Sequence, residues 1–173
     1  MQEIKILAIL SLVYISILSI NTIAIAFFRN SLFTQKINII KNNQSVLFYC
    51  FILSLIGTIS SLYLSEVKGL EPCKFCWFER ILLFPLVIIF LISWIKKEKF
   101  GVTMSLPFII LGMIMSAYHY LIQLFPSDES CDVISCSSPY IWELGFISIP
   151  LMAFFNFFGL LLIMINYKII GEK

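Results

Sequence analysis

The hydrophobic positions of this chain gather in five long runs that carry almost no charge. The third run is charged only at Glu79 and Arg80, near its start, and the fourth is uncharged apart from a possible charge on His119. A helix needs about 20 mostly apolar residues to cross a bilayer. The pattern therefore predicts five transmembrane helices, over residues 6–28, 45–65, 77–95, 100–127 and 144–167.

Composition supports the same class of protein. Of the 173 residues, 60% are hydrophobic and 13% are charged, whereas soluble domains carry about 25% charged residues. A domain of this size cannot hide that excess in one core, so lipid must act as the solvent. The net charge of +2 is small and the basic residues lie at the ends of the apolar runs, which gives no indication of nucleic-acid binding. We expect an all-α integral membrane protein.

The charges between the runs predict an orientation. The segments after the first and third runs and the C-terminal tail are basic, whereas the segment between the fourth and fifth runs carries only acids. Lys and Arg in short loops mark the cytoplasmic side. Both close pairs of cysteines then face the outside. The basic residues are Arg29, Lys36, Lys41, Lys96, Lys97, Lys99, Lys168 and Lys173, and the acids of the outer segment are Asp128, Glu129, Asp132 and Glu143.

The first run has a second interpretation as a cleaved signal peptide. Lys5, the apolar stretch and Ala24-Ile25-Ala26 resemble such a segment with its small-residue cleavage site. Cleavage after Ala26 would leave the next basic segment outside and turn the first cysteine pair inward. Because this contradicts the other loops, we favour an uncleaved helix with its N-terminus outside.

The first cysteine pair, Cys73 and Cys76, has two intervening residues and enters the third predicted helix. A thiolate near a helix N-terminus with a cation nearby is stabilised, and Arg80 lies one turn after Cys76 on the same face. The pair is therefore a candidate redox disulfide. The alternative for Arg80 is a side chain that reaches the membrane surface and pairs with Glu79 or a lipid headgroup.

The second pair, Cys131 and Cys136, lies in the outer acidic segment. It is either a structural staple or a shuttle disulfide that exchanges with the first pair and with an outside partner. A tetrahedral zinc site built from all four sulfurs is a third possibility, although zinc has little to organise in such short loops. The fifth cysteine, Cys50, has no partner at a useful spacing, and we expect it to serve helix packing.

These motifs resemble a known family. Cys73-x-x-Cys76-Trp77-Phe78-Glu79-Arg80 is similar to the signature of the DsbB/BdbC disulfide-bond formation proteins. Cys131-Asp132 through Cys136, followed by Gly145-Phe146-Ile147-Ser148-Ile149-Pro150, is similar to their second half. The resemblance covers roughly residues 45–167.

The resemblance implies an architecture and a location. It implies a four-helix redox bundle over residues 45–167, preceded by one additional N-terminal transmembrane helix and a basic loop (1–44) and followed by a cytoplasmic tail (168–173). The location implied is the bacterial inner membrane. The partners implied are a DsbA-like protein of the thioredoxin fold outside the membrane and a quinone, either ubiquinone or menaquinone, as the electron acceptor.

The resemblance also implies roles for single residues. Cys131 matches the cysteine that forms the mixed disulfide with the partner, and Cys136 matches its companion, which passes electrons to Cys73. Cys76 matches the cysteine that engages the quinone, and Arg80 matches the arginine beside the quinone ring. A cation there would stabilise negative charge growing on a quinone oxygen.

Two features depart from the family pattern. The first helix is additional. Only four residues separate Cys131 from Cys136, whereas many DsbB members have a long loop there, so the chain is closer to the BdbC-like branch.

Three further residues are candidates for quinone binding. His119 could contact the quinone or supply protons, but we favour an interfacial histidine that is hydrogen-bonded beside Tyr118 and Tyr120. Glu79 could relay protons or neutralise Arg80. Trp77 fits an interfacial aromatic belt and could also contact the ligand.

Two rival functions stay open at this point. One is a protein of the vitamin K epoxide reductase type, but there the CxxC motif follows the loop cysteines, whereas here it precedes them. The other is a non-catalytic membrane scaffold with structural disulfides or a zinc clamp.

Overall fold

The computed structural model describes residues 2–27, 43–98, 100–125, 136, 141–142 and 145–171, and all the elements in these ranges are helical. They are α1 (Gln2–Phe27), α3 (Asn43–Leu62), the π-helical turn η1 (Tyr63–Val67), α4 (Lys74–Lys96), α5 (Phe100–Leu124) and α6 (Ile149–Gly171). The prediction of an all-α protein is confirmed.

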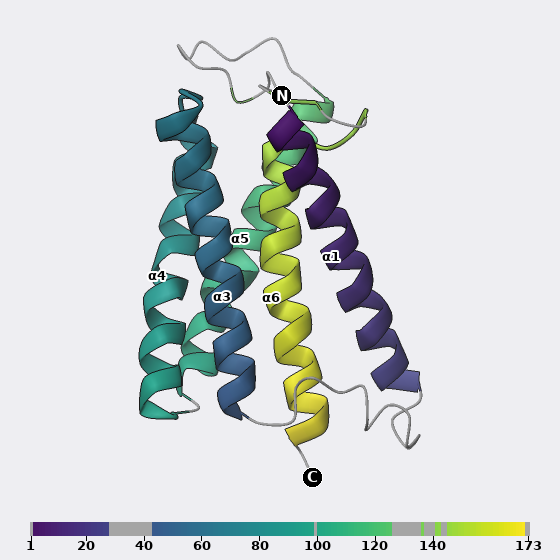
Figure 1. The fold of residues 1–173 in the computed structure, drawn as a ribbon, viewed down its shortest axis with the longest axis vertical. Coiled ribbons are helices and arrows are strands. Elements are labelled where there is room, and N and C mark those ends of the chain that lie inside the picture. The colour runs from purple at the N-terminus through teal and green to yellow at the C-terminus, as the bar shows by residue number, and fades with distance from the viewer. Residues whose placement is uncertain are drawn as a thin grey trace.

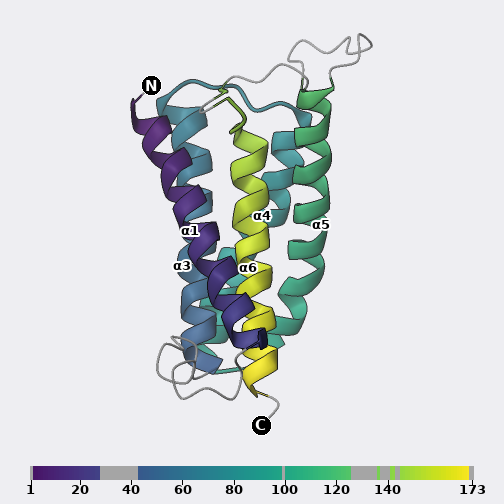
Figure 2. The ribbon, with the colours of Figure 1, turned by 90° about the vertical axis from the view of Figure 1, so that its right-hand side faces the viewer.

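The five α-helices lie side by side along one common direction (Figures 1 and 2). Neighbours in contact are α3 with α4, α4 with α5, α5 with α6, and α6 with α3, so these four helices close into a ring. The first helix, α1, packs against α6 outside that ring. The start of α4, the end of α5 and the start of α6 meet at one end of the bundle, which is also the end where the chain begins (Figure 1).

Three helical segments in the described residues are long and apolar enough to cross a membrane: Gln44–Val67, Lys74–Lys96 and Phe100–Leu124. The other two helices contribute shorter apolar stretches, Ala8–Ile20 and Ile149–Ile165. The chain is a multi-pass membrane protein.

Apolar side chains occupy both the centre and the outside of the bundle. The centre is closed by fully buried side chains from several helices, among them Leu86, Phe90 and Phe157. On the outer faces, Ile17, Ile88 and other large apolar residues are more than half exposed. This arrangement suits a bundle that is surrounded by lipid rather than water.

The helix ends differ slightly from those expected, with consequences for the site. Helix α4 begins at Lys74 with Cys73 as its N-cap, so both cysteines of the first pair lie within its first turn. Helix α6 begins at Ile149, five residues later than predicted, because Gly145 adopts a left-handed conformation (φ +80°). Pro150 then occupies the first turn, where proline is tolerated.

Candidate redox site

The first cysteine pair lies at the N-terminal end of α4 as two free thiols. Cys73 Sγ donates a hydrogen bond to Cys76 Sγ over 3.4 Å. Cys73 is buried, whereas Cys76 is partly exposed. A small movement would bring the sulfurs to the bonding distance of a disulfide, about 2 Å. The helix N-terminus favours negative charge nearby, so the accepting sulfur of Cys76 lies where a thiolate is stabilised.

His119 on α5 faces this pair from the neighbouring helix. Its Nε2 lies 3.6 Å from Cys73 Sγ, and its Nδ1 lies 2.9 Å from Oε1 of Glu79 on α4. With Nδ1 of the neutral ring donating to the carboxylate, Nε2 keeps a lone pair that faces Cys73 Sγ, and the single thiol proton can turn from Cys76 to this nitrogen. A nucleophile, a base and a carboxylate that orients the base are thereby lined up.

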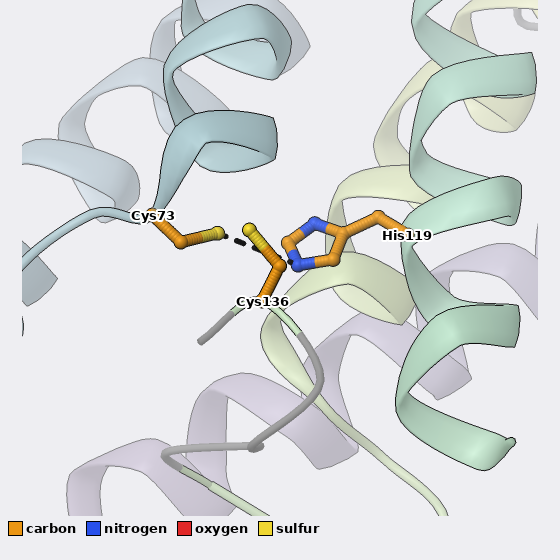
Figure 3. A group of neighbouring side chains, drawn as sticks. All are labelled: Cys73, His119 and Cys136. Atoms are coloured by element: carbon orange, nitrogen blue, oxygen red, sulfur yellow. Dashed lines mark hydrogen bonds between the residues drawn. The ribbon is translucent and has the colours of Figure 1, made fainter. Parts of the chain in front are cut away.

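The second cysteine pair reaches the same place through Cys136. The sulfurs of Cys73 and Cys136 and Nε2 of His119 all lie within 4.8 Å of one another. Figure 3 shows these three side chains converging from the start of α4, the loop before α6, and α5. Cys131 lies outside the described residues. The structure therefore brings one member of the outer pair to Cys73, within reach for thiol–disulfide exchange after a short movement.

The surroundings of Cys73 and Cys136 favour the neutral form of both thiols. The hydrogen bond to Cys76, together with burial, raises the pKa of Cys73 to about 12. Burial also raises the pKa of Cys136. Since only a thiolate attacks a disulfide, Cys73 needs a base to remove its proton, and His119 Nε2 is in place for this.

Arg80 lies on the side of α4 that faces α3, whereas Glu79 bonds to His119 on α5. Its Nε donates to the Ser61 hydroxyl and a terminal nitrogen donates to the Ser61 carbonyl oxygen, both at 2.9 Å. Its guanidinium also lies over the Trp77 ring, 5.6 Å from the ring centre. Only 9% of Arg80 is exposed. The alternative in which Arg80 pairs with Glu79 is not what the structure shows, because α3 supplies the hydrogen bonds of Arg80 and Glu79 bonds to His119.

A cavity of about 560 Å³ opens between α1, α3, α4 and α6. Drug-sized and cofactor ligands occupy pockets of about 300–1,000 Å³ that are mostly apolar, with a few polar groups. Cys76, Glu79 and Arg80 line one part of this cavity, and most of its remaining walls are aliphatic or aromatic. An apolar molecule with a polar ring fits these walls.

Two of the residues predicted to bind the ligand do not line this cavity. Within the described part of the chain, Trp77 and His119 are not among its lining residues. Trp77 is 55% exposed and contacts Arg80, as an aromatic belt residue would. His119 is only 1% exposed and bonds to Glu79, a partner 40 residues away in the sequence that sequence analysis did not identify.

Sequence analysis missed the residues that hold Arg80 and shape the cavity. Ser61, Tyr14 and Asn156 lie in apolar runs where a single polar residue has no distinguishing pattern. Cys50, in contrast, is fully buried in the core of the bundle, and its predicted packing role is confirmed.

The donors also suit a thiophilic metal ion. Cys73, His119 and Cys136 form one set, and Cys76, Glu79 and His119 form another, each with its ligand atoms within 4.8 Å. The zinc alternative therefore stays open, and the metal content of the purified protein tests it.

Comparison with known proteins points to one family. The sequence model described as "Disulfide bond formation protein DsbB" matches residues 43–166. The chain is 34% identical over 137 residues to a "Probable disulfide formation protein C" of Halalkalibacterium halodurans, an alignment that covers 77% of this chain and 98% of the relative.

Two relatives come from Bacillus subtilis. "Disulfide bond formation protein C" is 35% identical over 137 residues, covering 77% of this chain and 98% of the relative. "SPbeta prophage-derived disulfide bond formation protein B" is 38% identical over 113 residues, covering 64% and 76% respectively. No solved structure matches this chain.

Proposed function

Because the chain belongs to the DsbB family of disulfide bond formation proteins, we propose that it oxidises a protein dithiol outside the membrane and reduces a membrane quinone. A role in disulfide bond formation follows from the family. The finer reaction rests on one observation: Cys73 lies beside Cys136 on one side of α4, whereas its companion Cys76 lines an apolar cavity together with Arg80.

The overall reaction is balanced in electrons and protons. One dithiol of a DsbA-like thioredoxin-fold partner loses two electrons and two protons and becomes a disulfide. Quinone, the second substrate, accepts the two electrons and two protons and leaves as hydroquinone. Ubiquinone and menaquinone both fit this requirement.

The chain's own cysteines carry the electrons by two exchanges. The partner's thiolate attacks the disulfide between Cys131 and Cys136, forming a mixed disulfide with Cys131, and the partner's second thiolate releases it as the partner's own disulfide. The Cys131–Cys136 dithiol then reduces the disulfide between Cys73 and Cys76 in the same manner. Each exchange breaks one sulfur–sulfur bond and forms another, so the number of disulfides is conserved.

His119 and Glu79 serve the sulfur side. His119 Nε2 faces Cys73 and takes or returns the thiol proton, while the 2.9 Å contact from Nδ1 to Glu79 fixes the ring. A positioned general base of this kind contributes about 10²–10⁴-fold to the rate of a proton transfer.

Arg80 serves the cavity side. Two hydrogen bonds to Ser61 hold its guanidinium in place. A fixed cation in a water-poor site stabilises negative charge on a ligand oxygen far better than a mobile one in water. Arg80 thus favours transfer of electrons from Cys76 to an oxygen-bearing ring.

Membrane placement completes the proposal. We place the chain in a bacterial cell membrane with five spans, namely the four-helix unit of α3–α6 and the additional α1. The loop charges support an orientation in which the end that carries Cys73, Cys76 and Cys136 lies outside the cytoplasm.

The decisive experiment uses purified protein, a reduced thioredoxin-fold dithiol protein and a water-soluble ubiquinone or menaquinone analogue. We expect catalytic loss of quinone absorbance, with one quinone consumed per partner disulfide formed. Stoichiometric zinc in the purified protein, or disulfides that never turn over, would instead identify a structural scaffold.

A further inference from the structure

Helix α1 lies outside the family-matched residues 43–166, yet it forms one wall of the cavity that Cys76 and Arg80 line. Leu10, Ser11, Tyr14 and Leu18 are its lining residues, spaced so that they share one face of the helix. A second face, carrying Ile9, Val13 and Ile17 among others, is exposed in the way that lipid-facing residues are.

Tyr14 is the unusual residue of that wall. Its hydroxyl oxygen is buried and has no hydrogen-bond partner within the described residues. The tyrosine packs against α6 at Gly159, where an added Cβ would lie only 2.6 Å from the hydroxyl oxygen. The missing side chain at Gly159 therefore makes room for the phenol.

Asn156, one turn before Gly159 on α6, resembles Tyr14 in having a buried oxygen atom. Its Nδ2 donates to the Leu53 carbonyl oxygen over 3.3 Å, but its Oδ1 is buried and unpartnered in the same described part of the chain. Like Tyr14, it lines the cavity. The Asn156 amide occupies the space that a side chain at Gly57 would need, and Gly57 lies one turn along α3 from Ser61, the residue that holds Arg80.

Buried polar atoms without partners cost free energy and are uncommon in folded proteins. Here two such atoms belong to residues on two helices that line one cavity, and Cys76, Glu79 and Arg80 form another polar part of its wall. A phenol hydroxyl donates to a carbonyl oxygen, and an amide oxygen accepts from a hydroxyl. Together they suit a ring oxygen that is a carbonyl before reduction and a hydroxyl after it.

We propose that α1 completes the quinone site of this chain, with Tyr14 and Asn156 binding the ring oxygen that lies away from Arg80. The inference rests on the proposed function. It makes Tyr14 a binding residue contributed by a helix that the family match does not include.

The test compares Tyr14→Phe with wild-type protein, because this change removes the hydroxyl alone and keeps the ring against Gly159. The matched control is Ile17→Ala, on the same helix but 61% exposed and outside the cavity lining. Quinone binding is measured as the dissociation constant from quenching of tryptophan fluorescence, and thermal stability is measured without quinone.

We expect Tyr14→Phe to weaken quinone binding about fivefold, the effect of one net hydrogen bond. Its melting temperature without quinone should equal or exceed that of the wild type, because an unsatisfied buried hydroxyl has been removed. Ile17→Ala should bind quinone as the wild type does.

Two results would overturn the inference. One is an unchanged dissociation constant in Tyr14→Phe while the wild type binds quinone. The other is a lowered melting temperature with a loss of binding that Ile17→Ala shares, which would make α1 a structural support only. If the wild type neither binds nor reduces quinone, the proposed function itself fails, and this result is distinct from both.

Discussion

The two sides of α4 differ in what they offer to a reaction, although the residues responsible are neighbours in the sequence. On the α5 side, Glu79 and His119 form a buried hydrogen-bonded pair beside Cys73. On the α3 side, Arg80 is tied to Ser61 and lines an apolar cavity with Cys76. Glu79 also borders that cavity, so it connects the two sides.

This difference separates two kinds of chemistry. Exchange between sulfurs needs a base that moves a proton, whereas reduction of a ring needs a fixed cation near the oxygens that gain charge. Of the two sulfurs at the start of this helix, that of Cys73 lies beside His119 and Cys136. Cys76 also lies near His119 and Glu79, but it lines the cavity as well. Variants on the two sides should therefore fail in different steps.

The largest effect is expected for Cys73→Ser, because Cys73 Sγ is hydrogen-bonded to Cys76 Sγ and lies within 4.8 Å of Cys136 Sγ. We expect this variant to lose oxidation of the partner dithiol coupled to quinone reduction altogether. Cys50→Ala is the matched control, since Cys50 is a buried thiol of the core and should not carry electrons. Steady turnover by Cys73→Ser would contradict the relay.

Arg80→Ala should come next, with kcat/KM for quinone lowered about 10²–10³-fold, the effect of losing one charge-stabilising group. Both disulfides should still form, because exchange between sulfurs depends on the His119 and Glu79 side of α4 and not on the Arg80 guanidinium. Arg80→Lys keeps the charge but not the forked hydrogen bonding to Ser61, and should recover part of the loss. An equal loss in the sulfur exchange would remove the distinction between the two sides.

His119→Gln should slow the exchange at Cys73 about 100-fold, because the base is removed from the thiol that it faces. Glu79→Gln keeps the base and loses only part of its orientation, so its effect should be smaller. Rapid-quench thiol trapping measures this step directly. Quinone affinity should stay within about twofold of wild type in His119→Gln, since the histidine is not a lining residue of the cavity.

The smallest effect concerns the acidity of Cys73 in the reduced protein. Its pKa of about 12 is raised first by the hydrogen bond to Cys76, so Cys76→Ala should lower it, while burial keeps it above the ordinary value. Alkylation of Cys73 at pH 9 should then become faster, because a larger fraction is thiolate. Because the pKa of Cys73 is higher in the folded protein than in an unfolded chain, the reduced wild-type protein should lose stability as the pH rises from the ordinary thiol pKa toward 12.

Mass spectrometry of the alkylated peptide across pH 8–11 measures this change. An alkylation profile that is identical in both proteins would show that the Cys76 sulfur does not hold the Cys73 proton.

The sequence predicted the helices and the reactive cysteines better than the contacts between them. Apolar runs of span length are a local signal, and so is the Cys-x-x-Cys spacing followed by Arg80. The pairing of Glu79 with His119 joins residues 40 positions apart, and that of Arg80 with Ser61 joins residues 19 apart. No local pattern encodes which faces of two helices meet, so the sequence did not identify these polar partners inside the bundle.

The cavity illustrates the same limit. Its walls come from four helices, and its polar atoms include Tyr14 and Asn156, which read as ordinary residues of apolar runs. In a lipid-embedded bundle both the inside and the outside of a helix are apolar, so hydropathy alone does not tell a ligand-facing side from a lipid-facing one.

The most direct test of the account is a single-turnover reaction of Cys76→Ser with excess reduced partner and a quinone analogue, followed by quinone absorbance and by thiol trapping. The account predicts no loss of quinone absorbance, although the Cys131–Cys136 disulfide is still reduced by the partner. Quinone reduction at the wild-type rate in this variant would contradict it, because electrons would then bypass Cys76, the cysteine that lines the cavity beside Arg80.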